Sequence, residues 1–369
     1  MRVDKTKWEH ALIKDVIKTL KVKEAVQKKD YLLTGKYPII SQEKDFISGY
    51  CNSVDNLNDN LSNVVIFGDH TRIVKYVDFD FCVGADGVKV LQPNNKLSAK
   101  YLYYVIKWSD IPSNGYSRHF KFLKKIEIKY PKDKSIQQAI ASELDTIQAM
   151  IDGYKAQIAD LDALAQSIFL DMFGDPVTNP KRWEKGSLNK YASIGTGATP
   201  SRKIVSYYEG NISWVKSTEV HNSYIWETQE HITKEAIDNS NCSIYLPDTI
   251  LVAMYGQGKT RGQVGLLKIE AATNQACAAV QCKDSLNPIF CFWHFQMCYE
   301  ANRELGNGTN QKNMNLTIVG NIKFIIPPLA LQQQFAHRIE AIEQQKELIR
   351  FQLADAETLM AERMQYYFS

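Results

Sequence analysis

The sequence lacks the features of a membrane protein and of a disulfide-stabilised secreted protein. Its 369 residues contain no apolar run of the roughly 18 residues that a membrane-spanning helix needs. The opening residues MRVDKTKWEH have no apolar core of the kind found in signal peptides. The seven cysteines are odd in number and form no C-x-x-C pair, which argues against a disulfide framework and a zinc knuckle. We therefore expect a soluble, cytoplasmic protein with reduced cysteines and no metal.

The sequence also has little excess of either charge. It contains 44 basic and 41 acidic side chains, which gives a formal net charge of +3. With this balance an anionic partner would have to be held by local basic patches and not by a global field. The length leaves room for two or three domains, each able to bury its own core.

Signatures of catalysis are absent as well. No H-E-x-x-H or G-x-S-x-G motif occurs, and the histidines are scattered. The N/D-P-P-Y/F motif by which amino-methyltransferases hold their target base is missing, since IPPL at 326–329 shares only the prolines. Asp69-His70 could form an acid/base pair, but a turn after the strand-like VVIF explains this dipeptide more simply. The sequence predicts no catalytic residue and no cofactor bound by this chain.

What the sequence does contain is two long heptad repeats. Apolar residues in 136–173 recur at alternating steps of three and four, and the pattern returns 195 residues later, interrupted by Lys346 and Arg363. Because one seam needs another to cover it, we expect two long helices that form an antiparallel coiled coil. The two interruptions predict either an offset in packing or side chains directed towards a partner subunit. The seam residues are Leu144, Ile147, Ile151, Tyr154, Ile158, Leu161, Ala165 and Ile168, then Ile339, Ile342, Ile349, Leu353, Ala356 and Met360.

The segments before these helices are repeated too. Trp8-Glu9 recurs as Trp183-Glu184, 175 residues later, and Gln137 at the start of the first helix matches Gln332. Two strand-like runs that end in proline, 120–131 and 316–327, lead into the helices. The chain is therefore predicted to be a tandem duplication with about twenty extra residues in the second copy. Its predicted parts are a globular domain at 1–132, a spacer helix at 133–175, a second globular domain at 176–329 and a second spacer helix at 330–369.

Both globular parts read as short strands and turns with few helices, which makes the predicted fold α+β with a pseudo-two-fold repeat. Asp133 or Ser135 is the expected cap of the first long helix. The expected strands are 64–67, 78–91, 211–217, 249–255 and 263–269, and the expected shorter helices are 8–20, 97–108 and 287–306.

The sharpest local motif is AMYGQGKTRG at 253–262. It fits the A/G-x-x-x-x-G-K-T phosphate loop and follows a predicted strand. A phosphate loop must open directly into a helix, however, and here further glycines and the strand-like QVGLLKIE follow. Two interpretations remain besides nucleotide binding. The segment is either a purely structural hairpin, or a hairpin in which Lys259 and Arg261 meet DNA phosphates while Gln257 and Thr260 approach bases.

Other candidate DNA-binding residues lie in loops or just ahead of the first long helix. A basic cluster at 116–125 has as its counterpart the amide-rich NGTNQKNMN at 307–315. A solvated surface and ordinary turns would explain the same residues. The full set of candidates is Arg118, His119, Lys121, Ser201, Arg202, Lys203, Gln257, Lys259, Thr260, Arg261, Asn274, Gln275, Asn310, Gln311, Lys312 and Asn313.

Together these motifs resemble the DNA-specificity subunit of type I restriction-modification enzymes. The resemblance is carried by the W-E openings, GQGKTRG followed by ATNQACAAV, PPLALQQQFAHRIE, and the helix ending SIFLDMFGDP. FGDHT at 67–71 and GADGVKVLQP at 84–93 are similar to a common class of first target-recognition domain. The resemblance covers essentially the whole chain.

The resemblance implies a non-catalytic subunit in which each globular domain reads one half of a split DNA target. It implies that the coiled coil fixes the gap between the halves and docks two methyltransferase subunits, which methylate adenine at N6. S-adenosylmethionine, ATP and Mg are expected on partner subunits, including restriction subunits, and no membrane is involved. Two alternatives stay open: a P-loop-type nucleotide-binding protein through Ala253–Thr260, and a purely protein-binding adaptor.

Overall fold

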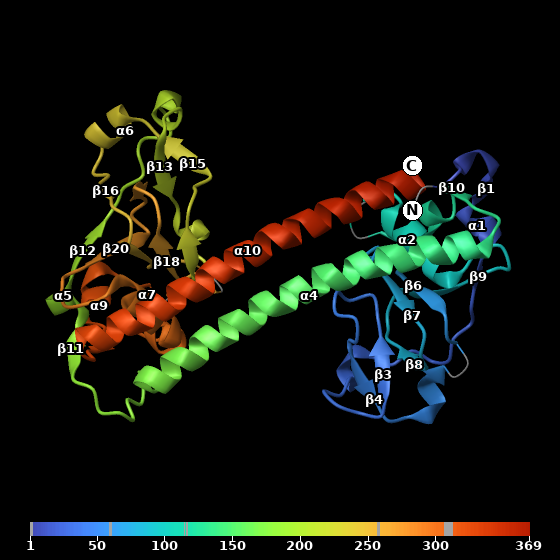
Figure 1. The fold of residues 1–369 in the computed structure, drawn as a ribbon, viewed down its shortest axis with the longest axis horizontal. Coiled ribbons are helices and arrows are strands. Elements are labelled where there is room, and N and C mark those ends of the chain that lie inside the picture. The colour runs from blue at the N-terminus through green and yellow to red at the C-terminus, as the bar shows by residue number, and fades with distance from the viewer. Residues whose placement is uncertain (1–2, 59–60, 114, 116, 257–258, 306–312) are drawn as a thin grey trace. The chain divides into compact units, whose positions relative to one another are not determined.

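The computed structural model describes residues 3–58, 61–113, 115, 117–256, 259–305 and 313–369 (Figure 1). The chain divides into two compact units. Unit 1 consists of residues 1–156 with 350–369, and unit 2 consists of residues 157–349. Both units mix short strands with helices, as expected for an α+β protein.

Two helices of 40 residues contribute to both units. These are α4 (Lys134–Phe173) and α10 (Leu329–Phe368), which confirm the two predicted long helices. Asp133 caps α4, since its carboxylate accepts the Ser135 N–H at 2.8 Å. The helix ends before Gly174, whose φ of +75° suits a glycine that terminates a helix.

In unit 1 the described residues form three sheets, of order β1-β10, β2-β9-β6-β7 and β4-β3-β8-β5. Helix α2 packs on the second sheet and buries Tyr101 and Leu102 against Val65 and Phe67. The strands are β1 (Glu9–Leu12), β2 (Ile17–Thr19), β3 (Tyr37–Ile40), β4 (Gly49–Cys51), β5 (Leu57–Asn58), β6 (Val64–Gly68), β7 (Val74–Val77), β8 (Phe81–Val83), β9 (Val88–Pro93) and β10 (Glu127–Tyr130), and the helices are α1 (Ile13–Val16), α2 (Ala99–Trp108) and α3 (Phe120–Leu123).

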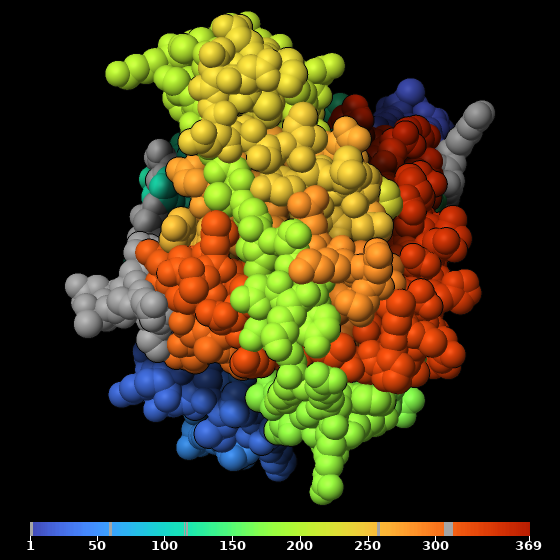
Figure 2. Space-filling view, turned by 90° about the vertical axis from the view of Figure 1, so that its left-hand side faces the viewer, coloured from blue at the N-terminus to red at the C-terminus, as the bar shows by residue number. Residues whose placement is uncertain are grey.

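In unit 2 the described residues again form three sheets, of order β11-β21, β12-β20-β17-β18-β14 and β15-β13-β19-β16. The third sheet and α6 form a lobe on the side away from the start of α10 (Figures 1 and 2). The strands are β11 (Lys185–Ser187), β12 (Ala192–Thr196), β13 (Ile212–Val215), β14 (Ser223–Ile225), β15 (Glu230–Ile232), β16 (Ile244–Tyr245), β17 (Ile250–Ala253), β18 (Val264–Leu267), β19 (Ala271–Thr273), β20 (Cys277–Cys282) and β21 (Lys323–Ile325), and the helices are α5 (Leu188–Tyr191), α6 (Lys234–Asp238), α7 (Pro288–Met297), α8 (Tyr299–Arg303) and α9 (Leu316–Asn321).

The two units share one topology, which confirms the tandem duplication. Four strands of the larger sheet correspond one to one, β2-β9-β6-β7 in unit 1 and β12-β20-β17-β18 in unit 2. In the smaller sheets the central pairs β3/β8 and β13/β19 are both parallel, while their outer neighbours are antiparallel. Strand β14 is an addition in unit 2, and it pairs with β18 in parallel.

Two buried glutamines make the duplication visible at the level of single bonds. Gln137 accepts the Ser98 N–H at 2.8 Å, and Gln332 accepts the Asn287 N–H at 2.9 Å. Each glutamine also donates at 2.8 Å to the carbonyl of the proline that precedes its long helix. Ser98 and Asn287 are the N-caps of α2 and α7, so in each unit the long helix is tied to the helix that covers the sheet.

Some predictions of local structure were wrong. Residues 8–20 form β1, the short α1 and β2 rather than one helix, and the helix expected at 287–306 is broken at Cys298 into α7 and α8. The runs 120–131 and 316–327 each begin with a short helix, α3 or α9, and only their last residues form a strand. Apolar residues in such short runs fit a helical turn as well as a strand, so periodicity alone could not separate them.

Candidate nucleic-acid interface

Three loops converge at one end of the sheets in unit 1. They are the β6–β7 turn at 69–73, the β8–β9 loop at 84–87 and the segment that leads into α3. The Asp69 N–H donates to the Gly87 carbonyl at 2.8 Å, and the His119 N–H donates to the Asp69 carbonyl, also at 2.8 Å. The β6–β7 turn is therefore the middle member of the group.

The same bonds recur in unit 2. The Met254 N–H donates to the Ala276 carbonyl at 2.8 Å, and the Met314 N–H donates to the Met254 carbonyl at 3.1 Å. The loops involved are the β17–β18 turn at 254–263, the β19–β20 loop at 274–276 and the segment that leads into α9. The topology thus brings together candidate residues from separate parts of the sequence, and it does so in the same way twice.

The candidates of unit 1 differ in exposure. Arg118 and Lys121 are exposed, and the Lys121 ammonium lies 4.9 Å from the centroid of the Phe122 ring. His119 is only 1% exposed, and its Nδ1 lies 3.0 Å from the Asp69 carbonyl oxygen. In this structure His119 holds the β6–β7 turn, while Arg118 and Lys121 face solvent.

The strands on either side of GQGKTRG form a hairpin, which is not the strand-to-helix connection of a phosphate loop. Strand β17 pairs with β18 in antiparallel fashion on the far side of the turn. Gly256 and Gly262 have φ values of +143° and +84°, which glycine adopts most readily. No helix follows whose N-terminal amides could bind a nucleotide phosphate, so the interpretation as a phosphate loop is not favoured.

Within this hairpin Lys259 is exposed, and Thr260 and Arg261 are half-buried. The Tyr299 hydroxyl donates to the Lys259 carbonyl, which ties the turn to α8. Gln257 lies outside the described residues.

The neighbouring loops contribute amide groups. Gln275 is exposed and accepts the Thr199 hydroxyl proton at 2.7 Å, and the Asn274 side chain accepts the Ala276 N–H at 3.1 Å. Asn313 is half-buried. The candidates Asn310, Gln311 and Lys312 lie outside the described residues.

Arg202 makes contacts within the smaller sheet of unit 2. Its guanidinium lies 4.0 Å from the Tyr208 ring centroid and 5.2 Å from that of Trp214, and its Nη1 lies 2.6 Å from Glu230. Hydrogen bonds from Arg202 and then Lys216 lower the pKa of the Glu230 carboxyl. The guanidinium is therefore engaged in a structural contact, while the flanking candidates Ser201 and Lys203 are exposed.

The seam residues of both long helices face inwards. Apart from the two seam alanines, the heptads predict twelve seam residues, and none of these twelve is exposed. In unit 1, Ile147 and Ile151 of α4 pack against Ala356 of α10. In unit 2, the Phe169 and Phe335 rings lie 5.4 Å apart. The buried seam residues are Leu144, Ile147, Ile151, Ile339, Ile342 and Ile349, and the half-buried ones are Tyr154, Ile158, Leu161, Ile168, Leu353 and Met360.

The two residues that interrupt the second heptad repeat form ion pairs within the chain. The Lys346 ammonium is 2.6 Å from both Asp162 of α4 and Glu343. Arg363 Nε is 2.5 Å from Glu143 of α4. The polar seam positions are therefore matched by carboxylates on the facing helix.

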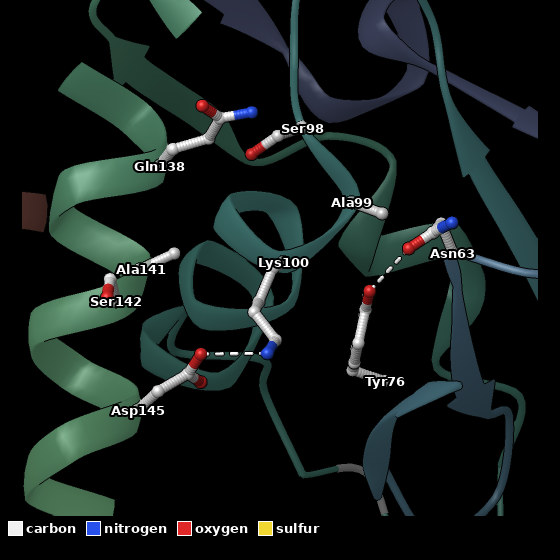
Figure 3. A pocket seen from close by; sticks show the side chains of 9 residues that line it. All are labelled: Asn63, Tyr76, Ser98, Ala99, Lys100, Gln138, Ala141, Ser142 and Asp145. Atoms are coloured by element: carbon white, nitrogen blue, oxygen red, sulfur yellow. Dashed lines mark hydrogen bonds and ion pairs between the residues drawn. The ribbon is translucent and has the colours of Figure 1, made fainter. Parts of the chain in front are cut away.

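A pocket of about 320 Å³ lies beside α4 in unit 1 (Figure 3). Lys100 points at Asp145, with 2.8 Å between the charged groups, and the Tyr76 hydroxyl donates to Asn63 at 2.6 Å. Tyr104 also donates to Asp145, at 2.8 Å. Because the charges in the pocket are paired with each other, its geometry does not suggest an acid/base site.

The described residues hold neither a metal site nor a membrane-spanning helix. No group of three or more histidine, cysteine, aspartate or glutamate side chains among them is placed to hold a metal ion. None of the helices in this part of the chain combines the length and apolarity needed to cross a bilayer. The seven cysteines carry free thiols.

Comparison with known proteins connects this architecture to DNA recognition. Residues 5–162 and 180–357 match the model of the type I restriction modification DNA specificity domain. The chain belongs to this family. The two matched segments are the two copies of the duplication, so each unit carries a specificity domain. The family and its named relatives are DNA-recognition components, and the chain is accordingly a specificity component and not a catalyst.

Two curated relatives are specificity subunits. The chain is 27% identical over 277 residues to the specificity subunit of the EcoR124I/EcoR124II type I restriction enzyme of Escherichia coli, which covers 70% of this chain and 67% of that protein. It is 22% identical over 287 residues to the MjaIX specificity subunit of Methanocaldococcus jannaschii. That match covers 69% of this chain and 65% of that protein. The matches thus span about two thirds of each relative.

Solved structures show the same fold along the whole chain. The type I restriction-modification S subunit from M. genitalium superposes with a TM-score of 0.67 at 15% identity, covering 100% of this chain and 98% of that one. A second solved structure concerns complex assembly and conformational transition of the type I restriction-modification system. It superposes with a TM-score of 0.53 at 14% identity and covers 98% of this chain and 97% of that one.

None of the DNA-binding candidates from the sequence lies in the β6–β7 turn of unit 1. Asp69-His70 lies in a turn, as predicted, but the topology makes this turn the equivalent of the GQGKTRG hairpin. One signal was present in the sequence, because Thr71-Arg72 repeats the Thr260-Arg261 pair of the second hairpin.

Proposed function

We propose that each specificity domain of this chain reads one half of a split sequence in double-stranded DNA. The observation that carries the proposal is the twofold occurrence of the same three-loop group on two domains of one topology. The described loops present cations such as Arg118, Lys121 and Lys259, which suit phosphate oxygens, and the amide of Gln275, which suits base edges. Two equivalent readers on one chain fit a target made of two parts.

The long helices would set the distance between the two half-sites as an antiparallel coiled coil. Support comes from contacts inside each unit. In unit 1, Lys155 of α4 pairs with Glu357 at 2.8 Å, and Glu143, earlier in α4, pairs with the later Arg363. At 1.5 Å per residue a 40-residue helix is about 60 Å long, enough to separate half-sites about one DNA turn, or roughly 34 Å, apart. Binding one half would raise the effective concentration of the other.

The chain would act with partner subunits in the cytoplasm. We propose that the helices dock two methyltransferase subunits, which methylate adenine with S-adenosylmethionine, and through them restriction subunits that use ATP and Mg. None of these cofactors is assigned to residues of this chain.

The test is to map methylated adenines in DNA treated with the purified complex of this chain, its methyltransferase partner and S-adenosylmethionine. We expect a two-part site with a fixed gap. Replacing residues 183–315 with the equivalent segment of a relative should change one half only. A single continuous motif, or a change in both halves together, would contradict the proposal.

The same complex separates the alternatives. DNA affinity should fall steeply as salt rises, because phosphate contacts release counterions. Salt-insensitive association, or no DNA binding, would favour the protein-binding adaptor. Nucleotide binding that Lys259→Ala abolishes would favour the P-loop-type protein.

A further inference from the structure

We propose that Arg72 reads a base in the half-site recognised by unit 1. The inference rests on the proposed function and deepens it, because it assigns a specificity-determining residue. Arg72 is exposed and closes the β6–β7 turn, the middle of the three converging loops.

The Arg72 side chain is held in place at one point. Its Nη1 donates to the Ile111 carbonyl at 2.8 Å. A guanidinium carries several further N–H donors in a rigid planar fork, so one bond orients the group without using up its hydrogen-bonding capacity. The backbone of Arg72 is fixed as well, since its N–H donates to the Gly68 carbonyl at 2.8 Å and its φ is +62°.

The turn that carries Arg72 is fastened to its neighbours by Gln42. The Gln42 side-chain amide donates to the Asp86 carbonyl at 2.7 Å and accepts the His70 N–H at 3.0 Å. The Thr71 hydroxyl donates to the Gln42 carbonyl at 2.8 Å. Gln42 is therefore a positioning residue that joins the turn to the β8–β9 loop, and little conformational freedom remains to be lost on binding.

The second unit repeats the arrangement. Gly262 occupies the place of Arg72, because its N–H donates to the equivalent Ala253 carbonyl at 2.9 Å and its φ is also positive, at +84°. Arg261 directly precedes it. In both turns, therefore, an arginine occupies the closing position or the position directly before it. Each specificity domain has one arginine at this place in its hairpin.

The chemistry of an oriented arginine suits a base edge. A guanidinium fork can bind phosphate oxygens as well, but a fork held in one orientation also matches the O6 and N7 acceptors of guanine in the major groove. The commonest specific contact between proteins and DNA is of this kind. An arginine anchored by a backbone carbonyl at the end of a firmly held turn is suited to it.

The test uses Arg72→Lys and Arg72→Ala in the complete chain, purified with its methyltransferase partner. Methylation is measured on a DNA library that varies every position of the split site. Because the exchange of residues 183–315 should change only the half read by unit 2, the half that stays the same belongs to unit 1. Both variants should lose about tenfold to a hundredfold in discrimination at one base pair of that half. The second half and the gap should not change. Lys36→Ala removes a charge at the start of β3, the opposite end of the strand from Gln42, and should leave every preference unchanged.

Each other outcome would overturn the inference. Unchanged base preferences in both variants would show that Arg72 reads no base. The proposed function would still stand in that case, provided that the wild-type complex recognises a split site. A uniform loss across all sequences, with a salt slope reduced by about one in the Ala variant, would make Arg72 a phosphate contact. Thermal unfolding of both variants far below the wild-type temperature would make its role structural. A wild-type complex without a split site would instead defeat the proposed function itself.

Discussion

The two units show the same backbone used with different side chains. Asp69 and Met254 occupy equivalent positions and make equivalent backbone hydrogen bonds, although one is acidic and the other apolar. His119 and Met314 form a second such pair, and both are buried. The fold of a specificity domain therefore depends on main-chain bonds at these loops, which leaves the side chains able to differ. That freedom is what two readers of different half-sites would require.

The loops themselves also differ in length and support. The turn of unit 1 has four residues between Gly68 and Ile73 and is fastened by Gln42. The turn of unit 2 is longer, contains several glycines and is tied to α8 by Tyr299. The second copy thus differs from the first in these loops and in the added strand β14, while the order of the four shared strands of the larger sheet is the same.

The largest expected effect concerns the main core of unit 2, in which more of the buried side chains are phenylalanine than in the main core of unit 1. Phe169 is fully buried, with the Phe173, Phe290 and Phe335 ring centroids 5.1, 5.9 and 5.4 Å away. Phe169→Ala should lower the free energy of unfolding by about 3–5 kcal/mol. Denaturant unfolding measures this. Leu348→Ala, on the exposed face of α10 in the same unit, should cost less than about 0.5 kcal/mol. Similar losses in the two variants would mean that this cluster does not hold the unit together.

The buried glutamines offer a direct test of equivalence. Gln137→Ala in unit 1 and Gln332→Ala in unit 2 each leave an N–H at a helix cap and a proline carbonyl without their partner. Each variant should lose about 2–3 kcal/mol of stability, because both bonds are buried or partly buried. The exposed Gln138, next to Gln137 on α4, provides the matched control as Gln138→Ala. Clearly unequal losses in Gln137→Ala and Gln332→Ala would show that the two connections are not energetically equivalent.

A difference in pH response should distinguish the units. His294 of α7 is fully buried and its Nε2 accepts the Ile325 N–H at 3.2 Å. Burial, and then the charge of Lys185, lowers the pKa of His294 from 6.5 to about 3. The unfolded chain therefore binds the proton more readily than the folded one. The stabilisation is fully present above pH 6.5 and is lost as the pH falls towards 3, with a loss of about 2 kcal/mol by pH 5.

This pH effect should be local to unit 2. Hydrogen exchange, corrected for its intrinsic pH dependence, should show lower protection of unit 2 at pH 5 than at pH 7. His294→Gln keeps an acceptor for the Ile325 N–H and cannot titrate in this range, so it should reduce the difference. An equal loss of protection in both units, or a loss that His294→Gln does not change, would point to another group.

Sequence reasoning predicted the parts of the fold that repeat and missed those that depend on packing. The heptads of 136–173 and the Asp133 cap predict α4 correctly because helical periodicity and capping are local. The helix α3 at Phe120–Leu123 was missed, since its position depends on the distant Asp69, whose side chain accepts the Phe120 N–H at 2.8 Å. The place of Arg72 beside the other loops likewise follows from strand order and not from any local pattern.

The smallest expected effects concern charges at the helix seam, where α10 carries Lys346 and the first repeat has Ile151. Lys346 is 6% exposed as a residue, and its partner Asp162 is about half exposed. Lys346→Ala should lower stability by about 1–2 kcal/mol, because it leaves Glu343 near the seam without this cation while Asp162 can turn to solvent.

Two matched variants would show whether the charge or the packing matters at this position. Lys346→Met keeps the length of the side chain and should be close to neutral or stabilising, as the apolar residue of the first repeat would suggest. Lys155→Ala removes an exposed pair with Glu357 and should cost less than about 1 kcal/mol, because solvent already screens that interaction. If Lys346→Met proved as destabilising as Lys346→Ala, the ion pair itself would be required at the seam. The two repeats would then differ in how their helices are held, and not only in which residue fills an equivalent position.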